Sequence, residues 1–363
     1  MSKSNIEWTG HTWNPIAGCS LKSPGCTHCY AMTMARRIEA MGNLPHYAGL
    51  TNVVNGNAVW TGKIAMAPDS ILLQPLQRKK STTYFVNSMS DLFHEDVPDE
   101  WIDRIFAIMA LAPQHTFQVL TKRSARMRKY FAADEKGQRA FWYRVDRAVD
   151  LLCADLGRGR YEIPAWPLPN VWLGVSCEDQ QRAEGRIPDL LATPAAIRFI
   201  SAEPLIGPIS LRWAKWDDWN GQDGNRRPTV DHLDGARMLD WVIAGGESGP
   251  GARPMNPDWV RELRAQCAEA RIAFFFKQWG AHLPVGQVLP GRGKVHGATA
   301  VRPGRMKLHC GGSQKQDPRH VFAERGVEFT SMDDGRLTFR VGKKAAGRLL
   351  DGREHNGMPG AAS

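Results

Sequence analysis

The chain has 363 residues, with 47 Lys and Arg against 37 Asp and Glu, which gives a formal net charge of +10. This length can bury a large hydrophobic core and suits one large α/β domain or two ordinary ones. The N-terminus has no apolar leader, and no apolar run approaches the ~20 residues of a membrane span. We therefore expect a cytoplasmic protein that has no membrane segment and is not a secreted disulfide scaffold.

Seven short apolar runs recur along the chain, and each suits a strand. The predicted strands cover residues 12–16, 83–86, 116–120, 171–175, 197–200, 241–244 and 272–276. Near-continuous apolar runs of this length are typical of strands that are buried on both faces of a parallel sheet. Helices are predicted at residues 30–41, 99–109 and 257–270. This alternation indicates βαβ units, in either a doubly wound sheet or a β/α barrel.

Polar side chains follow six of these predicted strands. The polar segments are residues 87–91, 121–123, 176–179, 201–204, 245–248 and 277–279. A barrel builds its active face from the C-terminal ends of many strands, whereas a doubly wound sheet concentrates its ligand groups at one switch point. The spread of polar groups over six strand ends therefore favours an α/β fold with a full or partial (β/α) barrel.

The barrel is predicted to occupy residues 1–280, with insertions at 128–170 (extra helices) and 207–235. Residues 281–363 form a basic C-terminal extension with a β-hairpin that turns at Asp334-Gly335 and a short helix near 343–350. Between Gln278 and Ser363 there are 14 Lys and Arg against 7 Asp and Glu. Such a balance favours a polyanionic partner, a nucleic acid or nucleotide, although a solubilising surface explains it equally well.

Three of the seven cysteines, Cys19, Cys26 and Cys29, lie in the loop of residues 18–30 with the spacing C-x6-C-x2-C. Three thiolates on one loop can hold three irons of a [4Fe-4S] cluster and leave the fourth iron open. A zinc site completed by His28 is the main alternative, although zinc motifs usually arrive as two separated pairs. A third interpretation is that the three cysteines bind no metal. The scattered cysteines, Cys153, Cys177, Cys267 and Cys310, suit inert buried positions.

Several segments together carry a family resemblance. They are Asn14-Pro15, Gly18-Cys19, Cys26-Thr-His-Cys29-Tyr30-Ala31, Ser88-Met-Ser-Asp91, Leu120-Thr-Lys-Arg123, Gly174-Val-Ser176, Ser201-Ala-Glu-Pro-Leu205, Gly245-Gly-Glu-Ser-Gly249, Lys277-Gln-Trp-Gly280 and Ala346-Gly-Arg-Leu-Leu-Asp-Gly-Arg353. With them the chain resembles the phage-associated three-Cys-motif family of uncharacterised radical-SAM-like proteins, within the radical S-adenosylmethionine (SAM) superfamily. The resemblance covers nearly the whole chain.

The resemblance implies a barrel of the radical SAM type, a [4Fe-4S] cluster on the three cysteines, and cleavage of SAM to a 5′-deoxyadenosyl radical. The expected cofactor-binding residues are Ser88, Ser90, Asp91, Lys122, Ser176 and Glu178, and the expected catalytic residues are Lys277, Glu247 and Glu203. A carboxylate at a strand end would pair with the SAM amine, and Lys122 or Arg123 with its carboxylate or a substrate phosphate. The implied partners are a nucleic-acid or nucleotide substrate, a protein encoded nearby, and a reductant such as flavodoxin or ferredoxin.

Two departures separate this chain from the common pattern of the superfamily. Three extra residues lie between Cys19 and Cys26, and Gly245-Gly246-Glu247 follows the sixth predicted strand instead of the second. The expected function is modification or repair of a nucleic acid or nucleotide. A non-catalytic nucleic-acid-binding protein with zinc or a cluster is the alternative, and a degenerate barrel that keeps its cluster for structure or sensing is a third. Purely structural roles also stay open, including helix capping for Asp91 and core packing for Trp279.

Overall fold

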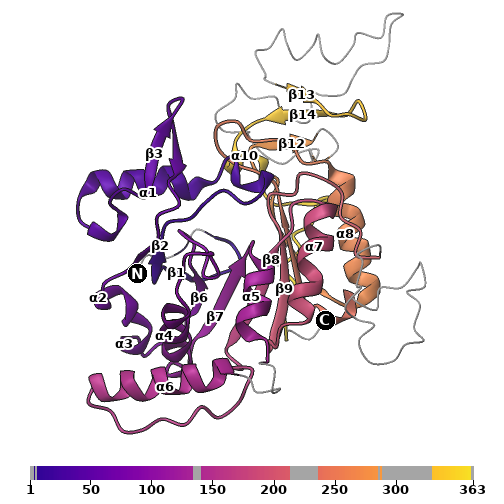
Figure 1. Cartoon of the computed structure of the whole chain (residues 1–363). Coiled ribbons are helices and arrows are strands. Elements are labelled where there is room, and N and C mark those ends of the chain that lie inside the picture. The colour runs from indigo at the N-terminus through magenta and orange to yellow at the C-terminus, as the bar shows by residue number, and fades with distance from the viewer. Residues whose placement is uncertain are drawn as a thin grey trace, which may run out of the picture.

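The structure is a computed structural model that describes residues 4, 6–133, 140–212, 236–284, 287 and 329–360. Its centre is a seven-stranded parallel sheet in the order β1-β6-β7-β8-β9-β10-β11 (Figure 1). These strands are β1 (His11–Trp13), β6 (Thr83–Val86), β7 (Thr116–Thr121), β8 (Val171–Ser176), β9 (Ile197–Ala202), β10 (Trp241–Gly245) and β11 (Ala273–Gln278). Neighbouring strands follow one another along the chain, so the sheet has no switch point and curls into a half-barrel.

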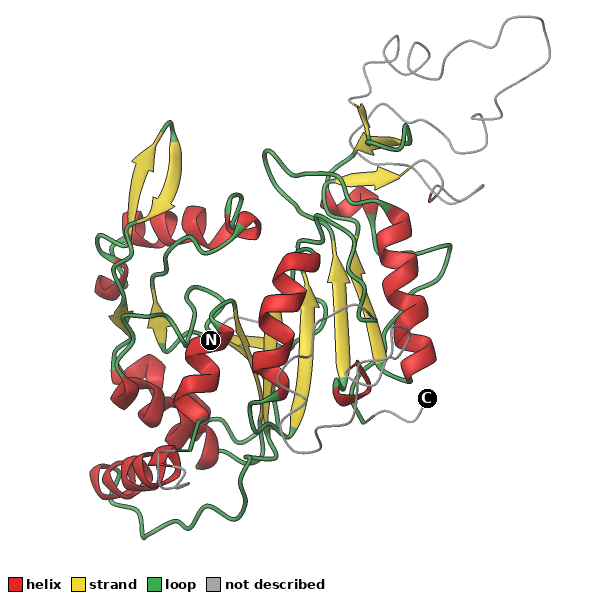
Figure 2. Cartoon of the chain, turned by 45° about the vertical axis from the view of Figure 1, so that its right-hand side comes forward, coloured by secondary structure: helices red, strands yellow, loops and turns green. Residues whose placement is uncertain are grey.

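Four helices follow the strands of the sheet and flank it (Figure 2). They are α4 (Asp99–Ala110), α5 (Ser124–Phe131), α7 (Gln180–Leu191) and α8 (Pro257–Ala270). The start of α8 is fixed by Asn256, whose side chain accepts a hydrogen bond from the backbone N–H of Asp258 at 2.9 Å, and by Pro257 in the first turn. Similarly, Asp179 caps α7 by accepting from the N–H of Arg182 at 3.0 Å. The predicted barrel is confirmed as a partial barrel.

Aromatic side chains fill the inner face of the half-barrel. Phe199, Trp241 and Phe275 from three neighbouring strands pack with Trp8, which enters from the N-terminal segment. The C-terminal segment closes the other side, because the N–H of Phe276 donates to the carbonyl of His355 at 2.9 Å in an antiparallel pairing along β11. The barrel is therefore completed by side chains and by the tail, without an eighth strand in the described sheet.

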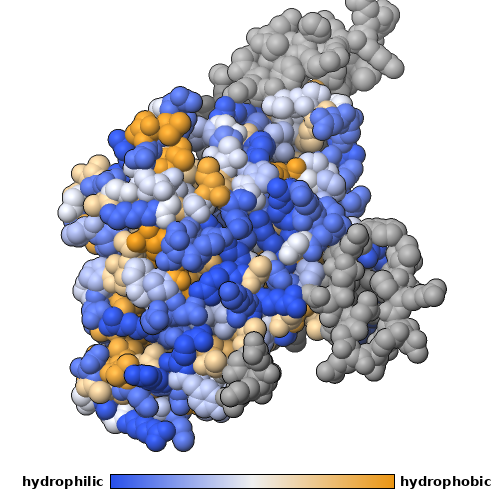
Figure 3. All heavy atoms as spheres, in the orientation of Figure 1, coloured by the Kyte–Doolittle hydropathy of each residue, from blue (hydrophilic) through white to orange (hydrophobic). Residues whose placement is uncertain are grey.

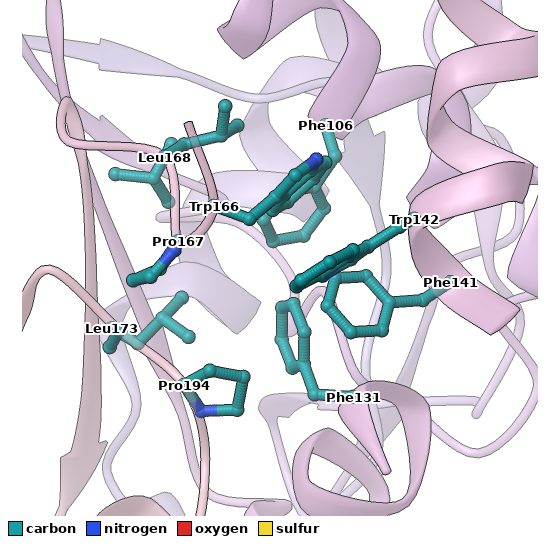
Figure 4. Close-up of a pocket in the computed structure, with 11 residues that line it drawn as sticks. Phe106, Phe131, Phe141, Trp142, Trp166, Pro167, Leu168, Leu173 and Pro194 are labelled. Carbon is teal, nitrogen blue, oxygen red and sulfur yellow. The ribbon is translucent and has the colours of Figure 1, made fainter. Parts of the chain in front are cut away.

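The insertion at 128–170 contains one long helix, α6 (Ala140–Asp155), where the sequence predicted several. Its buried face packs aromatic rings against α4 and α5, and Trp142 stacks on Trp166 with their ring centroids 6.2 Å apart. A small apolar cavity of about 10 Å³ remains between them (Figure 4). Because this space is about the size of one water position and has no charged lining, it belongs to the core.

Shorter elements complete the described chain. They are β2 (Ile16–Ala17), η1 (Pro24–Cys26), α1 (Tyr30–Met41), η2 (Pro45–Tyr47), β3 (Thr51–Val54), β4 (Asn57–Trp60), β5 (Ala65–Met66), α2 (Asp69–Leu72), α3 (Gln74–Gln77) and η4 (Ala236–Met238). The β3–β4 hairpin was not predicted, although Asn55-Gly56 between apolar residues is a strong hairpin signal. Most of the insertion at 207–235 lies outside the described residues.

The C-terminal extension forms a small antiparallel sheet of β12 (His282–Pro284), β14 (Leu337–Arg340) and β13 (Phe329–Ser331). The predicted hairpin is confirmed as β13 and β14, which β12 joins. The helix predicted near 343–350 is shorter, because α10 (Lys343–Ala346) ends at Gly347, whose φ is +69°. Within the described residues, no helix has the length and apolar character needed to cross a bilayer.

Candidate functional site

The cysteine loop, residues 18–30, is attached to the C-terminal edge of the half-barrel. Its first residue, Gly18, donates its N–H to the carbonyl of Met89 at 3.2 Å and pairs with Ser90 just beyond β6. The loop then turns through η1, and Cys29 lies directly before the first residue of α1. Sequential parallel strands bring all their carboxyl ends to one edge, so the loop lies where a β/α barrel carries its chemistry.

The three thiols of this loop are partly buried and form no disulfide, and Cys29 interacts electrostatically with both Cys19 and Cys26. Burial and the charge of Asp91 together raise the pKa of the Cys19 thiol to about 12, although the charge of Arg123 opposes them. Burial also raises the pKa of Cys29, and so does the neighbouring Cys26. Thiolates at these positions therefore need added positive charge, which a metal centre supplies. The backbone N–H groups of Ala31 and Met32, at the start of α1, act on the Cys29 sulfur in the opposite direction and lower its pKa.

A zinc site and an iron–sulfur cluster place different demands on their ligands. Among the described residues, no three His, Cys, Asp or Glu side chains are placed to hold one metal ion. A zinc site needs its ligands to converge on one point, whereas the cysteines of a cluster each bind a different iron. His28, the expected fourth zinc ligand, is exposed and packs against Gly251, where an added Cβ would lie 2.8 Å from its Cε1.

Arg123 fastens the cysteine loop to β7. Its guanidinium donates to the carbonyl of Ser20 at 3.2 Å and to the Ser20 hydroxyl at 2.7 Å, and Nη1 lies 3.7 Å from Sγ of Cys19. On its other side Arg123 pairs with Asp91 at 3.2 Å and with Glu95 at 2.7 Å. Because these partners use its donors, Arg123 is committed to holding the loop, and the expected contact with a bound carboxylate or phosphate has no free donor.

Asp91 is likewise engaged within the protein. Oδ1 accepts from the Thr121 hydroxyl at 2.6 Å and the N–H of Phe93 at 3.0 Å, while Oδ2 accepts from the N–H of Lys122 at 2.9 Å and from Arg123. These four bonds match the acceptor capacity of a carboxylate. The geometry therefore gives Asp91 a positioning role, because its oxygens are already occupied by β7 and the residues around it.

Glu178, at the end of β8, is fully buried and holds the middle of the cysteine loop. It pairs with Lys122 at 2.9 Å and Arg186 at 2.7 Å, and it accepts from the hydroxyl of Ser23. Burial alone would raise the pKa of Glu178, but the charges of Lys122 and Arg186 outweigh this and hold it below its usual value. The ammonium of Lys122 also donates to the hydroxyl of Ser176 at 3.0 Å, and the side chain of Lys122 is 20% exposed.

Glu247, in the loop after β10, is part of a second contact with the cysteine loop. Arg253 binds it through three hydrogen bonds, Nε to Oε2 at 2.8 Å, Nη2 to Oε1 at 2.7 Å and the backbone N–H to Oε2 at 2.9 Å. The same Nη2 donates to the carbonyl of Pro24 at 3.0 Å. Gly245 allows this loop to pass close to its neighbours, because an added Cβ at Gly245 would lie 2.6 Å from Oε1 of Glu203.

Glu203 and Lys277 form a separate charged pair on the inner side of the half-barrel, at 3.0 Å. The other oxygen of Glu203 accepts from the indole N–H of Trp8 at 3.3 Å and the hydroxyl of Ser201 at 3.2 Å. Both side chains keep a small exposed fraction, 13% for Glu203 and 17% for Lys277. A polar ligand can therefore reach this pair more easily than it can reach Asp91 or Glu178.

The remaining predicted residues, Ser88 and Ser90, hold the base of the loop. The Ser88 hydroxyl donates to the side chain of Asn14 at 3.0 Å, and the Ser90 hydroxyl donates to the carbonyl of Ile16 at 2.9 Å. The predicted residues thus form two groups. One group surrounds the cysteine loop, and the Glu203–Lys277 pair lies within the half-barrel. Trp279, a candidate for stacking, is 1% exposed and donates its indole N–H to the carbonyl of Leu349, so it is a core residue.

Residues 3–359 match the family described as a protein of unknown function, DUF5131. The chain belongs to this family. No curated protein and no solved structure matches it. For this family member, the geometry of the site therefore carries the functional argument.

Sequence reasoning missed several residues that shape the site, including Ser20, Glu95, Arg186 and Arg253. Glu95, Arg186 and Arg253 act on the cysteine loop or on its partners from distant parts of the chain, and Ser20 lies in the loop but bonds to the distant Arg123. No local motif therefore marks these residues. One signal was present in the three-residue insertion between Cys19 and Cys26. In the structure this Ser23–Gly25 segment makes the contacts with Glu178 and Arg253.

Proposed function

We propose that the protein is a cytoplasmic radical-SAM-type enzyme that binds a [4Fe-4S] cluster through Cys19, Cys26 and Cys29. The observation that carries this proposal is the attachment of three clustered thiols to the carboxyl edge of a sequential parallel half-barrel. When bound, such a cluster would supply the electron that cleaves SAM to methionine and a 5′-deoxyadenosyl radical, which abstracts a hydrogen atom from the substrate.

The residues of the chain would bind SAM and protect its radical from water. Lys122 is partly exposed beside the cysteine loop and suits the SAM carboxylate, because its charge also acts on Cys29. Glu203, paired with Lys277 inside the half-barrel, suits the SAM amine or a polar substrate group. The aromatic inner face around Trp8 and Trp241 supports the exclusion of water.

For the substrate, we propose a nucleic acid or nucleotide. The support is the net charge of +10 and the basic balance of residues 278–363, which favour a polyanion. Removing residues 281–363 would disturb the sheet that the tail completes, so single Lys or Arg changes on the exposed surface make a cleaner test. A salt-dependent gel shift with DNA and with RNA measures this binding.

The decisive experiment is anaerobic reconstitution with iron and sulfide, followed by addition of SAM and dithionite. We expect ~4 Fe per chain, a brown protein and 5′-deoxyadenosine as product. Cys26→Ala should lose the iron, whereas Cys153→Ala, a buried cysteine on α6, should keep it. Bound zinc without iron would support the non-catalytic nucleic-acid-binding alternative, and iron without any SAM cleavage would contradict the catalytic proposal.

A further inference from the structure

Exposed apolar side chains gather around the cysteine loop. The described residues include nine large hydrophobic side chains that are exposed, and six of them lie between residues 21 and 54. These six are Leu21, Tyr30, Met34, Met41, Val53 and Val54, with exposed fractions from 40% to 67%. They come from the loop, α1 and the β3–β4 hairpin, where Figure 3 shows hydrophobic residues grouped on the surface. We call this surface the α1 face.

The outward side of α1 is unusually apolar for a surface helix. Tyr30, Met34, Arg37 and Met41 are spaced i, i+4, i+7 and i+11, so they form one stripe along the helix. The opposite side is already buried, because Ala31, Met32 and Ala35 pack in the core with Leu50 and Trp60. Folding of this chain accounts for Tyr30, whose hydroxyl bonds to the carbonyl of Ser88, but not for Met34 and Met41. An exposed apolar stripe of this kind is typical of an interaction site.

The charge around the α1 face is mainly positive. From Trp8 to Pro68 the sequence holds a single carboxylate, Glu39, against Lys22, Arg36, Arg37 and Lys63. Glu39 accepts from the N–H of Gly49 at 2.7 Å, and Lys22 pairs with Glu95. Arg36 and Arg37 are exposed and make no hydrogen bond or ion pair with another described residue. The face therefore offers two free guanidinium groups beside apolar side chains.

This composition fits a protein partner with an acidic surface. Tyr, Met and Arg are enriched in protein interfaces, while Glu and Asp are depleted. Two free cations are few for a nucleic acid, whose binding depends on many phosphate contacts. The face also lies next to the cysteines, since Tyr30 follows Cys29 directly and its hydroxyl donates to the carbonyl of Ser88 at 3.0 Å. A protein docked here would lie against the loop that carries the thiols.

We propose that the α1 face is the docking surface for a small acidic electron-carrier protein. This inference rests on the proposed function, because SAM cleavage consumes one electron at the site and the carrier is oxidised by one electron to supply it. The guanidinium groups of Arg36 and Arg37 pair with carboxylates of the carrier, and Met34 and Tyr30 cover its apolar contact area. A carrier docked on α1 would lie close to Cys29, which shortens the distance that the electron must travel.

The test uses an acidic flavodoxin as the carrier and compares two double variants of the full chain. Arg36→Glu with Arg37→Glu reverses the charge of the α1 face. Arg147→Glu with Arg158→Glu reverses the same number of charges at two exposed positions on and just after α6, far from α1 in the fold (Figure 1). Calorimetry measures flavodoxin binding at low and moderate salt, and product analysis measures 5′-deoxyadenosine formed with reduced flavodoxin or with dithionite.

We expect the charge reversal on α1 to weaken flavodoxin binding about tenfold or more and to remove its salt dependence. Flavodoxin-driven turnover should fall in parallel, while dithionite-driven turnover and the α6 control stay unchanged. Unchanged binding by the α1 variant would overturn the inference, and so would a nucleic-acid gel shift that only this variant loses. Met34→Gln provides a milder variant if the charge reversal prevents folding. If dithionite gives no product with the wild type, the proposed function fails, while calorimetry still decides the docking site.

Discussion

Gly25 lies directly against the carboxylate group of Glu178. A Cβ added at Gly25 would lie 2.5 Å from Cγ and 2.7 Å from Oε1 of this buried residue. Glu178 cannot move away easily, because Lys122 and Arg186 hold it from both sides. The cysteine loop therefore has one closely fitted point of contact with the end of β8.

Gly25→Ala should displace the cysteine loop from Glu178. Overpacking at a fixed neighbour costs about 1–3 kcal/mol, so we expect a lower free energy of unfolding and weaker iron retention. Urea denaturation and iron analysis after anaerobic reconstitution measure the two effects. Gly185→Ala is the matched control, since Gly185 is an exposed residue of α7 with no atom within 4 Å of an added Cβ. That change should stabilise the protein by about 0.5–1 kcal/mol. Equal behaviour of the two variants would contradict the fitted contact.

Arg253→Lys should loosen the second contact of the cysteine loop. Lysine keeps the positive charge but cannot bridge both oxygens of Glu247 and the carbonyl of Pro24 at once. We expect iron to be lost about tenfold faster to a chelator, with little change in the thermal midpoint, because Arg253 is one-third exposed. Arg182→Lys, which alters an i,i+3 pair on α7, serves as control. Iron release at the wild-type rate would show that the bridge to Pro24 does not hold the loop.

Glu95 should make the fold sensitive to acid. Burial would raise its pKa, but hydrogen bonds from Lys22 and Arg123 outweigh this and lower the pKa from 4.5 to about 2. A depressed carboxyl pKa stabilises the folded state above the unfolded pKa, so this contribution is complete above pH 4.5 and is lost as the pH falls towards 2. The stability difference between wild type and Glu95→Gln should therefore shrink over that range. A difference that is constant from pH 6 to pH 3 would refute the assignment.

Glu203 and Lys277 offer a test that separates structure from function. Lys277→Met leaves the Glu203 carboxylate without its cation, and Glu203→Gln leaves the ammonium without its anion, so each single change should destabilise the fold by about 1–3 kcal/mol. The double variant removes both charges and should recover most of that stability. SAM binding and cleavage should remain impaired in all three variants if the pair contacts a ligand. Full activity in the stable double variant would limit the pair to a structural role.

The sheet was predictable because its strands are short apolar runs followed by polar residues. The sixth predicted run begins at Trp241 together with β10, and the Gly245-Gly246-Glu247 segment falls where β10 ends. Helices α1 and α8 have the predicted bounds, since their caps and apolar faces are local in sequence. The α7 helix was missed, because Pro188 and Gly185 within it weaken the helical signal.

The roles of the site residues were less predictable, because they depend on contacts across the chain. Asp91 was expected to bind a cofactor, yet its bonds to Thr121 and Lys122 use the oxygens that such a role requires. No sequence motif marks Arg253, whose link to the cysteine loop is its hydrogen bond to the carbonyl of Pro24. The spacing of the cysteines in the sequence identified the thiols, whereas the residues that surround them could be found only from the fold.

The packing of Trp8 near Met358 on the inner face has a consequence for how the protein is made. A ribosome delivers the N-terminal strands first, and the segment that pairs with β11 around Asn356 emerges only after all seven strands of the described sheet. Until then, one side of the aromatic interior is uncovered, and the nascent chain exposes an apolar surface that favours aggregation. The protein therefore depends on the segment around Asn356 and Met358 to leave the aggregation-prone stage of folding, so chains that lack this segment should be insoluble.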